Sequence, residues 1–169
     1  MSLSSLDLSK ILIDGTIFSF IASGYLLAVL WLNPRLFLQD YPKDVQEKVP
    51  PKSPTENRLA TYFGSGFLLI LILGPFLSTL FLKISSSTVL PFEVLFIHAF
   101  GVASLFNLVD WIILDWLLFC TIQPKFMIIP GTDNMAGYKD YFMHFRGFLI
   151  GSLISALGAI IIAAVVYFI

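Results

Sequence analysis

Apolar runs separated by polar connections dominate the hydrophobic pattern of this chain. Four of them, residues 11–32, 62–82, 91–120 and 142–169, are long. Each meets the length of about 20 apolar residues that a helix needs to cross a bilayer. Ser53-Pro54-Thr55-Glu56 has the form of a capping box, which starts the second helix ahead of its apolar part. The pattern predicts transmembrane helices at about residues 11–32, 54–83, 91–120 and 138–168.

These elements predict an all-α integral membrane protein. We expect an antiparallel four-helix transmembrane bundle that forms a single transmembrane domain over residues 1–169. The two long connections, at about residues 33–53 and 121–137, are predicted to form a small cytoplasmic cap. In the first, residues 42–49 favour a short helix, and four apolar side chains are expected at the level of the lipid headgroups. These four are Leu36, Phe37, Leu38 and Tyr41.

The second long connection alternates prolines with apolar residues between Thr121 and Thr132. This pattern predicts an extended segment that turns at Pro130-Gly131 and packs across the mouth of the bundle as a lid. The alternative is an ordinary turn with an apolar patch at the membrane interface.

Composition supports the membrane class. The chain is 57% hydrophobic and only 12% charged, whereas soluble domains average roughly 25% charged residues. The net charge of −1 argues against nucleic acid as a partner. A single cysteine, Cys120, excludes an internal disulfide and a thiolate metal cage.

Basic residues predict the orientation. They are concentrated in the two long connections and at the start of the last helix, and the other side carries Lys10 and Lys83. By the positive-inside rule the long connections are cytoplasmic and both termini lie outside, as expected for a multi-pass protein of the plasma membrane. The basic residues on the long-connection side are Arg35, Lys43, Lys48, Lys52, Arg58, Lys125, Lys139 and Arg146.

Polar residues within the third helix give the sharpest functional signal, because ionisable groups inside a membrane are costly. On an α-helical wheel five polar residues fall within roughly 140°, a side that we expect to face the bundle interior. They are Glu93, Ser104, Asn107, Asp110 and Asp115. Either Asp115 is hydrated and Asp110 bonds a neighbouring helix, or Asp110 and Asn107 bind or relay a ligand.

Other ionisable residues are placed by the same reasoning. His98 lies roughly opposite Asn107 on the wheel, and Cys120 lies away from the acidic side. Asp14 is interpreted as a hydrated residue near the start of the first helix, although a buried functional role stays open. The second helix has no ionisable residue in its body and is assigned a packing role.

The fourth helix brings a histidine to the same depth as the acids. Its small residues predict tight helix packing on the face that carries His144. That face comprises Asp140, His144, Gly147, Gly151, Ser155 and Gly158. The candidate ligand-binding site is therefore Asn107, Asp110, Asp115, Asp140 and His144.

No cofactor is predicted. His98 and His144 start helices on opposite sides of the membrane, which disfavours a haem held by both. The acids and His144 are suitable metal ligands. However, their spacing matches no named motif, and Asp110 and Asp115 diverge by about 140° on an α-helix. No metal site is predicted, but the sequence leaves metal binding by this cluster open.

Three classes of function remain. The first is transport or binding of a cation, a proton or a small amphiphilic ligand. The second is an intramembrane lipid-modifying enzyme that uses an Asp and His144 as acid and base, so the sequence leaves open whether the protein is an enzyme. The third is an accessory or structural subunit. The expected partners are the lipid bilayer, a small-molecule, ion or lipid ligand, and a homo-oligomer or larger membrane complex.

Overall fold

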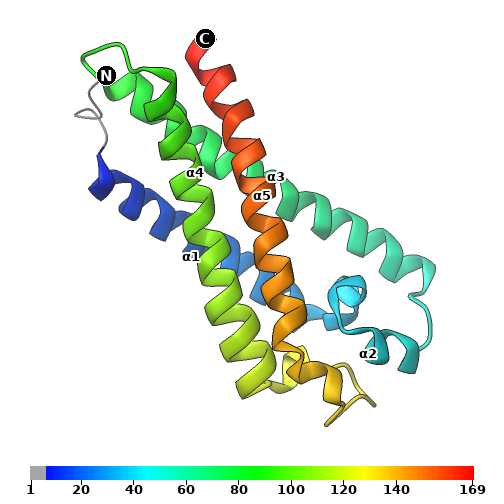
Figure 1. Cartoon of the computed structure of the whole chain (residues 1–169). Coiled ribbons are helices and arrows are strands. Elements are labelled where there is room, and N and C mark those ends of the chain that lie inside the picture. The colour runs from blue at the N-terminus through cyan, green and yellow to red at the C-terminus, as the bar shows by residue number, and fades with distance from the viewer. Residues whose placement is uncertain (1–6) are drawn as a thin grey trace.

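A computed structural model describes residues 7–169, which form a bundle of helices that run alternately in opposite directions (Figure 1). Four spans are long and apolar enough to cross a membrane, and the described part of the chain contains no strand. The predicted antiparallel four-helix bundle is therefore confirmed; residues 1–6 of the predicted single domain lie outside the described residues. The spans are α1 (Leu8–Leu32), α3 (Pro54–Ser85), α4 (Phe92–Val109) with its continuation η3 (Asp110–Ile122), and α5 (Tyr141–Phe168).

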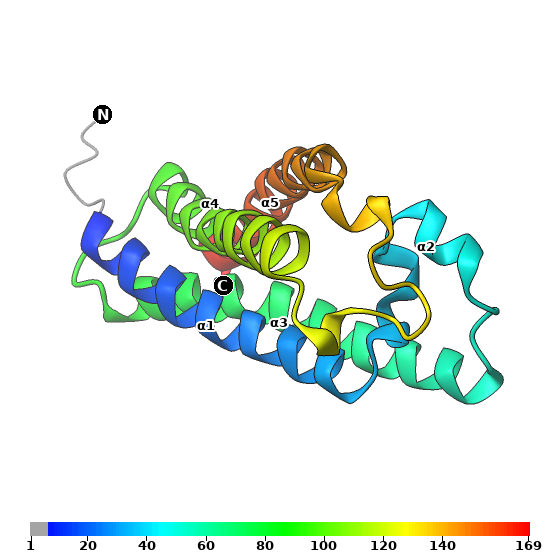
Figure 2. The same cartoon turned by 90° about the horizontal axis from the view of Figure 1, so that it is seen from below.

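The bundle is built around α4. It lies beside α5, while α1 and α3 cross this pair at an angle (Figures 1 and 2). Phe18 and Ala22 of α1 are buried against Val102 and Phe106 of α4 in the middle of the bundle. The Phe18 and Phe106 rings meet edge to face, with centroids 5.5 Å apart.

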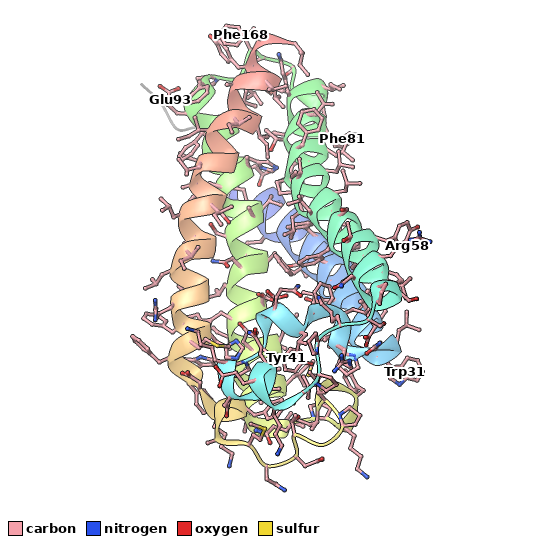
Figure 3. The ribbon with its side chains drawn as sticks, turned by 90° about the vertical axis from the view of Figure 1, so that its right-hand side faces the viewer. Trp31, Tyr41, Arg58, Phe81, Glu93 and Phe168 are labelled. Carbon is pink, nitrogen blue, oxygen red and sulfur yellow. The ribbon has the colours of Figure 1, made fainter. Side chains whose placement is uncertain are left out.

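Large apolar side chains cover the outer faces of the helices. Phe20 and Trp31 of α1, Phe81 of α3 and Phe142 of α5 are all strongly exposed. Figure 3 shows Trp31 and Phe81 projecting away from the bundle. A soluble monomer rarely exposes so much contiguous apolar surface, so these faces are suited to contact lipid.

The two ends of the bundle differ. The start of α1 and the end of α5 lie together at one end, which we call the open end (Figure 1). Four short helices cover the opposite end, the cap end (Figure 2). This cap consists of η2 (Pro34–Asp40), α2 (Lys43–Lys48), η4 (Lys125–Met127) and η5 (Ala136–Lys139).

Local sequence signals set the helix boundaries near the cap. α1 ends at Leu32, and the side chain of the next residue, Asn33, accepts a hydrogen bond from the backbone of Arg35 across Pro34. The capping box at the start of α3 is present, with reciprocal hydrogen bonds between Ser53 and Glu56. Glu56 also accepts a 2.7 Å bond from Nε of Arg35. These contacts join the cap to α3, and the short helix predicted at residues 42–49 is present as α2.

The cap has its own apolar core. Leu36, Phe37, Leu38 and Tyr41 pack inside it with apolar residues of the second connection. The second connection therefore covers these side chains, and their level relative to the lipid headgroups stays a prediction. Burial raises the pKa of Tyr41, whose protonated hydroxyl donates a 2.8 Å bond to the carbonyl of Met127.

The second connection crosses the cap end as the sequence predicts, but it is not extended throughout, because Lys125–Met127 forms the short helix η4. Its apolar side chains Met127 and Ile129 are buried, so they do not form an interfacial patch. Tyr138 fixes its path, because its hydroxyl accepts a 3.0 Å bond from the backbone of Ile129 and lies 2.7 Å from the Thr132 hydroxyl. Gly131 takes a positive φ of 85° at the predicted turn, a conformation that suits glycine.

The cap-end half of the third span is a π-helix. Hydrogen bonds in such a helix join residues five apart, and π-helical turns are frequent at functional sites. Side chains five residues apart therefore point in more similar directions here than in an α-helix, and both Asp115 and Cys120 lie beside His144. The predicted divergence of about 140° between Asp110 and Asp115 assumed an α-helix and does not apply to this π-helical segment. Cys120 lies beside His144, which contacts Asp115, and so does not lie away from the acids as predicted.

Candidate functional site

The centre of the candidate site is a contact between α5 and η3. His144 stands on the first turn of α5, and its Nδ1 atom lies 3.1 Å from Oδ1 of Asp115. The histidine is only 8% exposed, and its ring centroid lies 5.0 Å from that of Phe119. Its Nε2 atom is buried without a hydrogen-bond partner among the described residues, and Cys120 lies next to the ring.

Two further carboxylates belong to this neighbourhood. Asp110 is half-buried one π-helical turn from Asp115, and the charges of Asp115, His144 and Asp40 act on it. Asp40 ends η2, so the cap contributes a charge that the sequence did not suggest. Loss of hydration raises the pKa of Asp40, and the nearby Asp115 acts in the same direction. We call Asp40, Asp110, Asp115 and His144 the cap-end cluster.

Asn107 lies one helical turn from Asp110, towards the middle of the bundle. Its amide nitrogen donates to the carbonyl of Phe148 at 3.1 Å and to the hydroxyl of Ser152 at 3.0 Å. A side chain on Gly151 would overlap the Asn107 amide, so glycine is needed there. Asn107 therefore holds α4 against α5 at the cavity described below.

Asp140 is placed differently from the other candidate residues. It is exposed and caps α5, accepting a 2.9 Å bond from the backbone of Met143. The structure thus brings Asp110, Asp115 and His144 together, sets Asn107 one turn away and leaves Asp140 at the surface. A negative residue at a helix N-terminus is stabilised by the dipole, which accounts for its position.

Small residues on one face of α5 line a cavity. Only some of them pack closely against a neighbouring helix. A side chain added at Gly147 or Gly158 would meet no atom within 4 Å, so the close packing predicted at these positions is wrong. The cavity has a volume of about 600 Å³ and lies between α3, α4 and α5. Asn107 and Ser155 are its polar lining residues, and the rest of the lining is apolar or glycine.

Figure 3 shows the same region from the side, with α5 and α3 on either side of α4 and the cap below them. The cavity extends along α4 from Ala99 to Asn107, and its volume is within the range of roughly 300–1,000 Å³ that ligand sites occupy. The cap-end cluster lies beyond Asn107 towards the cap. Going along the bundle towards the cap, the apolar cavity therefore comes first and the acidic cap-end cluster second.

A second polar cluster occupies the open end. Oδ2 of Asp14 accepts bonds from Nζ of Lys10 at 2.9 Å and from the Ser78 hydroxyl at 2.6 Å. The same hydroxyl lies 2.8 Å from Nε2 of His98, which is 1% exposed. A smaller pocket of about 310 Å³ is lined by Lys10, Asp14 and Ser78 together with apolar residues.

Sequence reasoning missed this open-end cluster of Lys10, Asp14, Ser78 and His98. Asp14 is not simply a hydrated residue at a helix start, because it bonds Ser78 of α3. The packing role predicted for the second helix is also incomplete, because Ser78 of α3 hydrogen-bonds both Asp14 and His98. One signal was present: Asp14 and His98 each lie six residues after the first residue of a helix that starts at the same end.

Metal ligation finds no support in this geometry. Among residues 7–169, no group of three or more His, Cys, Asp or Glu side chains is arranged to hold a metal ion.

Comparisons with protein-family models, curated proteins and solved structures find no match to this chain. The cavity and the two clusters are therefore the features of the molecule that bear on function.

Proposed function

We propose that the protein binds a small amphiphilic molecule inside the membrane. The apolar chain of the ligand occupies the cavity between α3, α4 and α5, and its polar head lies at Asn107, Asp110, Asp115 and His144. The observation that carries this proposal is the cavity of about 600 Å³, which is apolar along most of its lining. Such a space favours a hydrocarbon chain over a hydrated ion, because an ion would lose its hydration there without compensating ligands.

The polar groups support a head at the cap end. Asn107 lines the cavity, and its amide nitrogen is already bonded to α5, which leaves the amide oxygen to accept a bond. Asp110, Asp115 and Asp40 follow towards the cap. These three carboxylates outnumber the one imidazole, which contacts Asp115, and an acidic site favours a head that donates hydrogen bonds or carries positive charge.

A cavity-filling substitution tests the proposal. Gly158→Leu places a side chain in the cavity, where it meets no atom within 4 Å at Cβ, while Gly147→Leu adds the same side chain at a position outside the cavity lining. In lipid nanodiscs, titration with a dansyl-labelled dodecylamine should show affinity reduced at least tenfold by Gly158→Leu and unchanged by Gly147→Leu. Equal affinity of wild type and Gly158→Leu would refute the proposed chain site.

The head site is tested separately. Asp110→Asn removes a charge with almost no change in shape, so it should weaken binding of the dodecylamine probe while leaving that of an uncharged dodecyl probe unchanged. If both probes bind equally to wild type and Asp110→Asn, the acidic cluster does not contact the ligand head, whatever the cavity does.

An intramembrane lipid-modifying enzyme is the second candidate, and one observation favours it. Asp115 contacts one nitrogen of His144 and leaves the buried Nε2 atom free, as in a general base held by a carboxylate. Under this function His144→Gln would abolish turnover of a bound lipid and retain its binding. A variant that loses binding together with turnover would argue against a role in chemistry alone.

We further propose that the cap faces the cytoplasm and that the chain resides in the plasma membrane. The excess of Lys and Arg in the connections that form the cap supports this orientation. Ser87 lies exposed at the open end and Lys125 lies exposed in the cap. On intact cells a membrane-impermeant maleimide should label Ser87→Cys and spare Lys125→Cys; the reverse result would invert the orientation.

A further inference from the structure

The open-end cluster contains a buried imidazole whose polar neighbours lead to a pocket. His98 is 1% exposed and does not line that pocket. Its Nε2 atom lies 2.8 Å from the Ser78 hydroxyl and 3.5 Å from Oδ2 of Asp14. Ser78 and Asp14 both line the pocket of about 310 Å³. The Ser78 hydroxyl therefore stands between the buried ring and the pocket.

Hydrogen positions follow from what each group can donate. An ionised carboxylate only accepts, and a serine hydroxyl has one hydrogen to give. With Asp14 ionised, Ser78 donates across the 2.6 Å contact to Asp14 and accepts from N–H at Nε2 of His98. With Asp14 protonated, the carboxylic acid donates to Ser78, and Ser78 donates to an unprotonated Nε2. The same heavy-atom positions satisfy both states.

We infer that the open-end cluster is a second functional site, at which a proton passes between His98 and Asp14 through the Ser78 hydroxyl. In one direction the Nε2–H bond of the imidazolium breaks as an Oγ–H bond forms on Ser78, and the original Ser78 hydrogen moves to Oδ2 of Asp14. An imidazolium and a carboxylate become a neutral imidazole and a carboxylic acid. The pair keeps its net charge, and Asp14 then loses the proton to a water molecule that enters the pocket and becomes hydronium.

The surrounding charges belong to the start of α1. Lys10 is the counter-ion of Asp14 at 2.9 Å, and the charges that act on His98 are those of Asp14, Lys10 and Asp7. The arrangement differs from a hydrolytic triad. Ser78 lies between the acid and the histidine and gives its hydrogen to the acid, so His98 does not withdraw that hydrogen to create a nucleophile.

Hydrogen exchange at His98 tests the inference independently of any amphiphile. The sequence holds only two histidines, so ¹⁵N-histidine labels two imidazole rings, and His144→Gln identifies the ring signals of His98. The rate at which the His98 ring N–H exchanges with water is then measured by NMR in nanodiscs. Ser78→Ala should slow this exchange at least tenfold, and Ser78→Thr, which keeps a hydroxyl, should retain it.

The matched control is Ser152→Ala, which removes a hydroxyl between α4 and α5, away from the open-end cluster; it should leave the rate unchanged. A purely structural role for Ser78 predicts the opposite sign, because looser packing admits water and speeds exchange. Exchange in Ser78→Ala that equals or exceeds the wild-type rate would overturn the inference. Asp14→Asn, which removes the proton acceptor, gives the same test if Ser78→Ala does not fold.

Discussion

Nδ1 of His144 lies 3.1 Å from Oδ1 of Asp115, and this contact joins the first turn of α5 to the π-helix η3. The imidazole is 8% exposed and the Asp115 side chain 27% exposed, so water screens the pair only in part. The contact links the segment that carries the acids to the helix that lines the cavity. The geometry of the proposed head site therefore depends on it.

Asp115→Asn should lower the free energy of unfolding by about 1–2 kcal/mol, because it removes a charge-assisted hydrogen bond to a buried ring. Thermal unfolding in detergent measures the change. Asp133→Asn is the control, since Asp133 is exposed and its replacement should stay within about 0.5 kcal/mol of wild type. If Asp115→Asn and His144→Gln destabilise additively when combined, the two side chains are not coupled.

Gly151→Ala should destabilise the protein by about 1–3 kcal/mol, because the added methyl group overlaps the Asn107 amide and separates α5 from α4. Gly147→Ala lies on the same helix with no atom within 4 Å of the new Cβ and should stabilise it by about 0.5–1 kcal/mol. Thermal unfolding of both variants in detergent checks that the two substitutions change the stability in opposite directions. Equal shifts would mean that Asn107 does not pack against Gly151.

The fold could be predicted because its signals are local. The length of each apolar run gives the spans, and Pro34 and the Ser53–Glu56 capping box give helix ends that the structure reproduces. The π-helix could not be predicted, because an apolar run has the same composition in either helical form. Its hydrogen bonds between residues five apart nevertheless change the directions in which Asp110, Asp115 and Cys120 point.

The open-end cluster could not be predicted for a different reason. Asp14, Ser78 and His98 come from three helices, and a wheel drawn for one helix contains no information about its neighbours. Each residue alone resembles an isolated polar group at the membrane surface. The homo-oligomer or larger complex suggested by the small-residue faces stays a prediction, as does ligand binding by the site residues.

Tyr138→Phe should destabilise the cap by about 1–3 kcal/mol, because it leaves the buried backbone N–H of Ile129 without its acceptor. The loss should appear first as faster tryptic cleavage at Lys125, which lies in the same segment. Tyr141→Phe is the control: this hydroxyl is exposed and lies 3.0 Å from Thr121, so water replaces its contact. Cleavage that is equally fast in both variants would exclude a specific role for the Tyr138 hydroxyl.

Asp40→Asn should stabilise the protein at pH 7 by an amount that shrinks as the pH falls. Desolvation in the cap raises the pKa of Asp40 above its ordinary 3.8, and Asp115 adds to this effect against the opposing contacts of Gln39 and Lys52. Above the raised pKa the folded state carries the full cost of the charge. As the pH falls towards about 4, the folded state takes up the proton before the unfolded state does, and wild type recovers this stability. Melting temperatures of wild type and variant at pH 7, 6, 5 and 4 measure the difference, and a gain that is constant over this range would contradict the assigned cause.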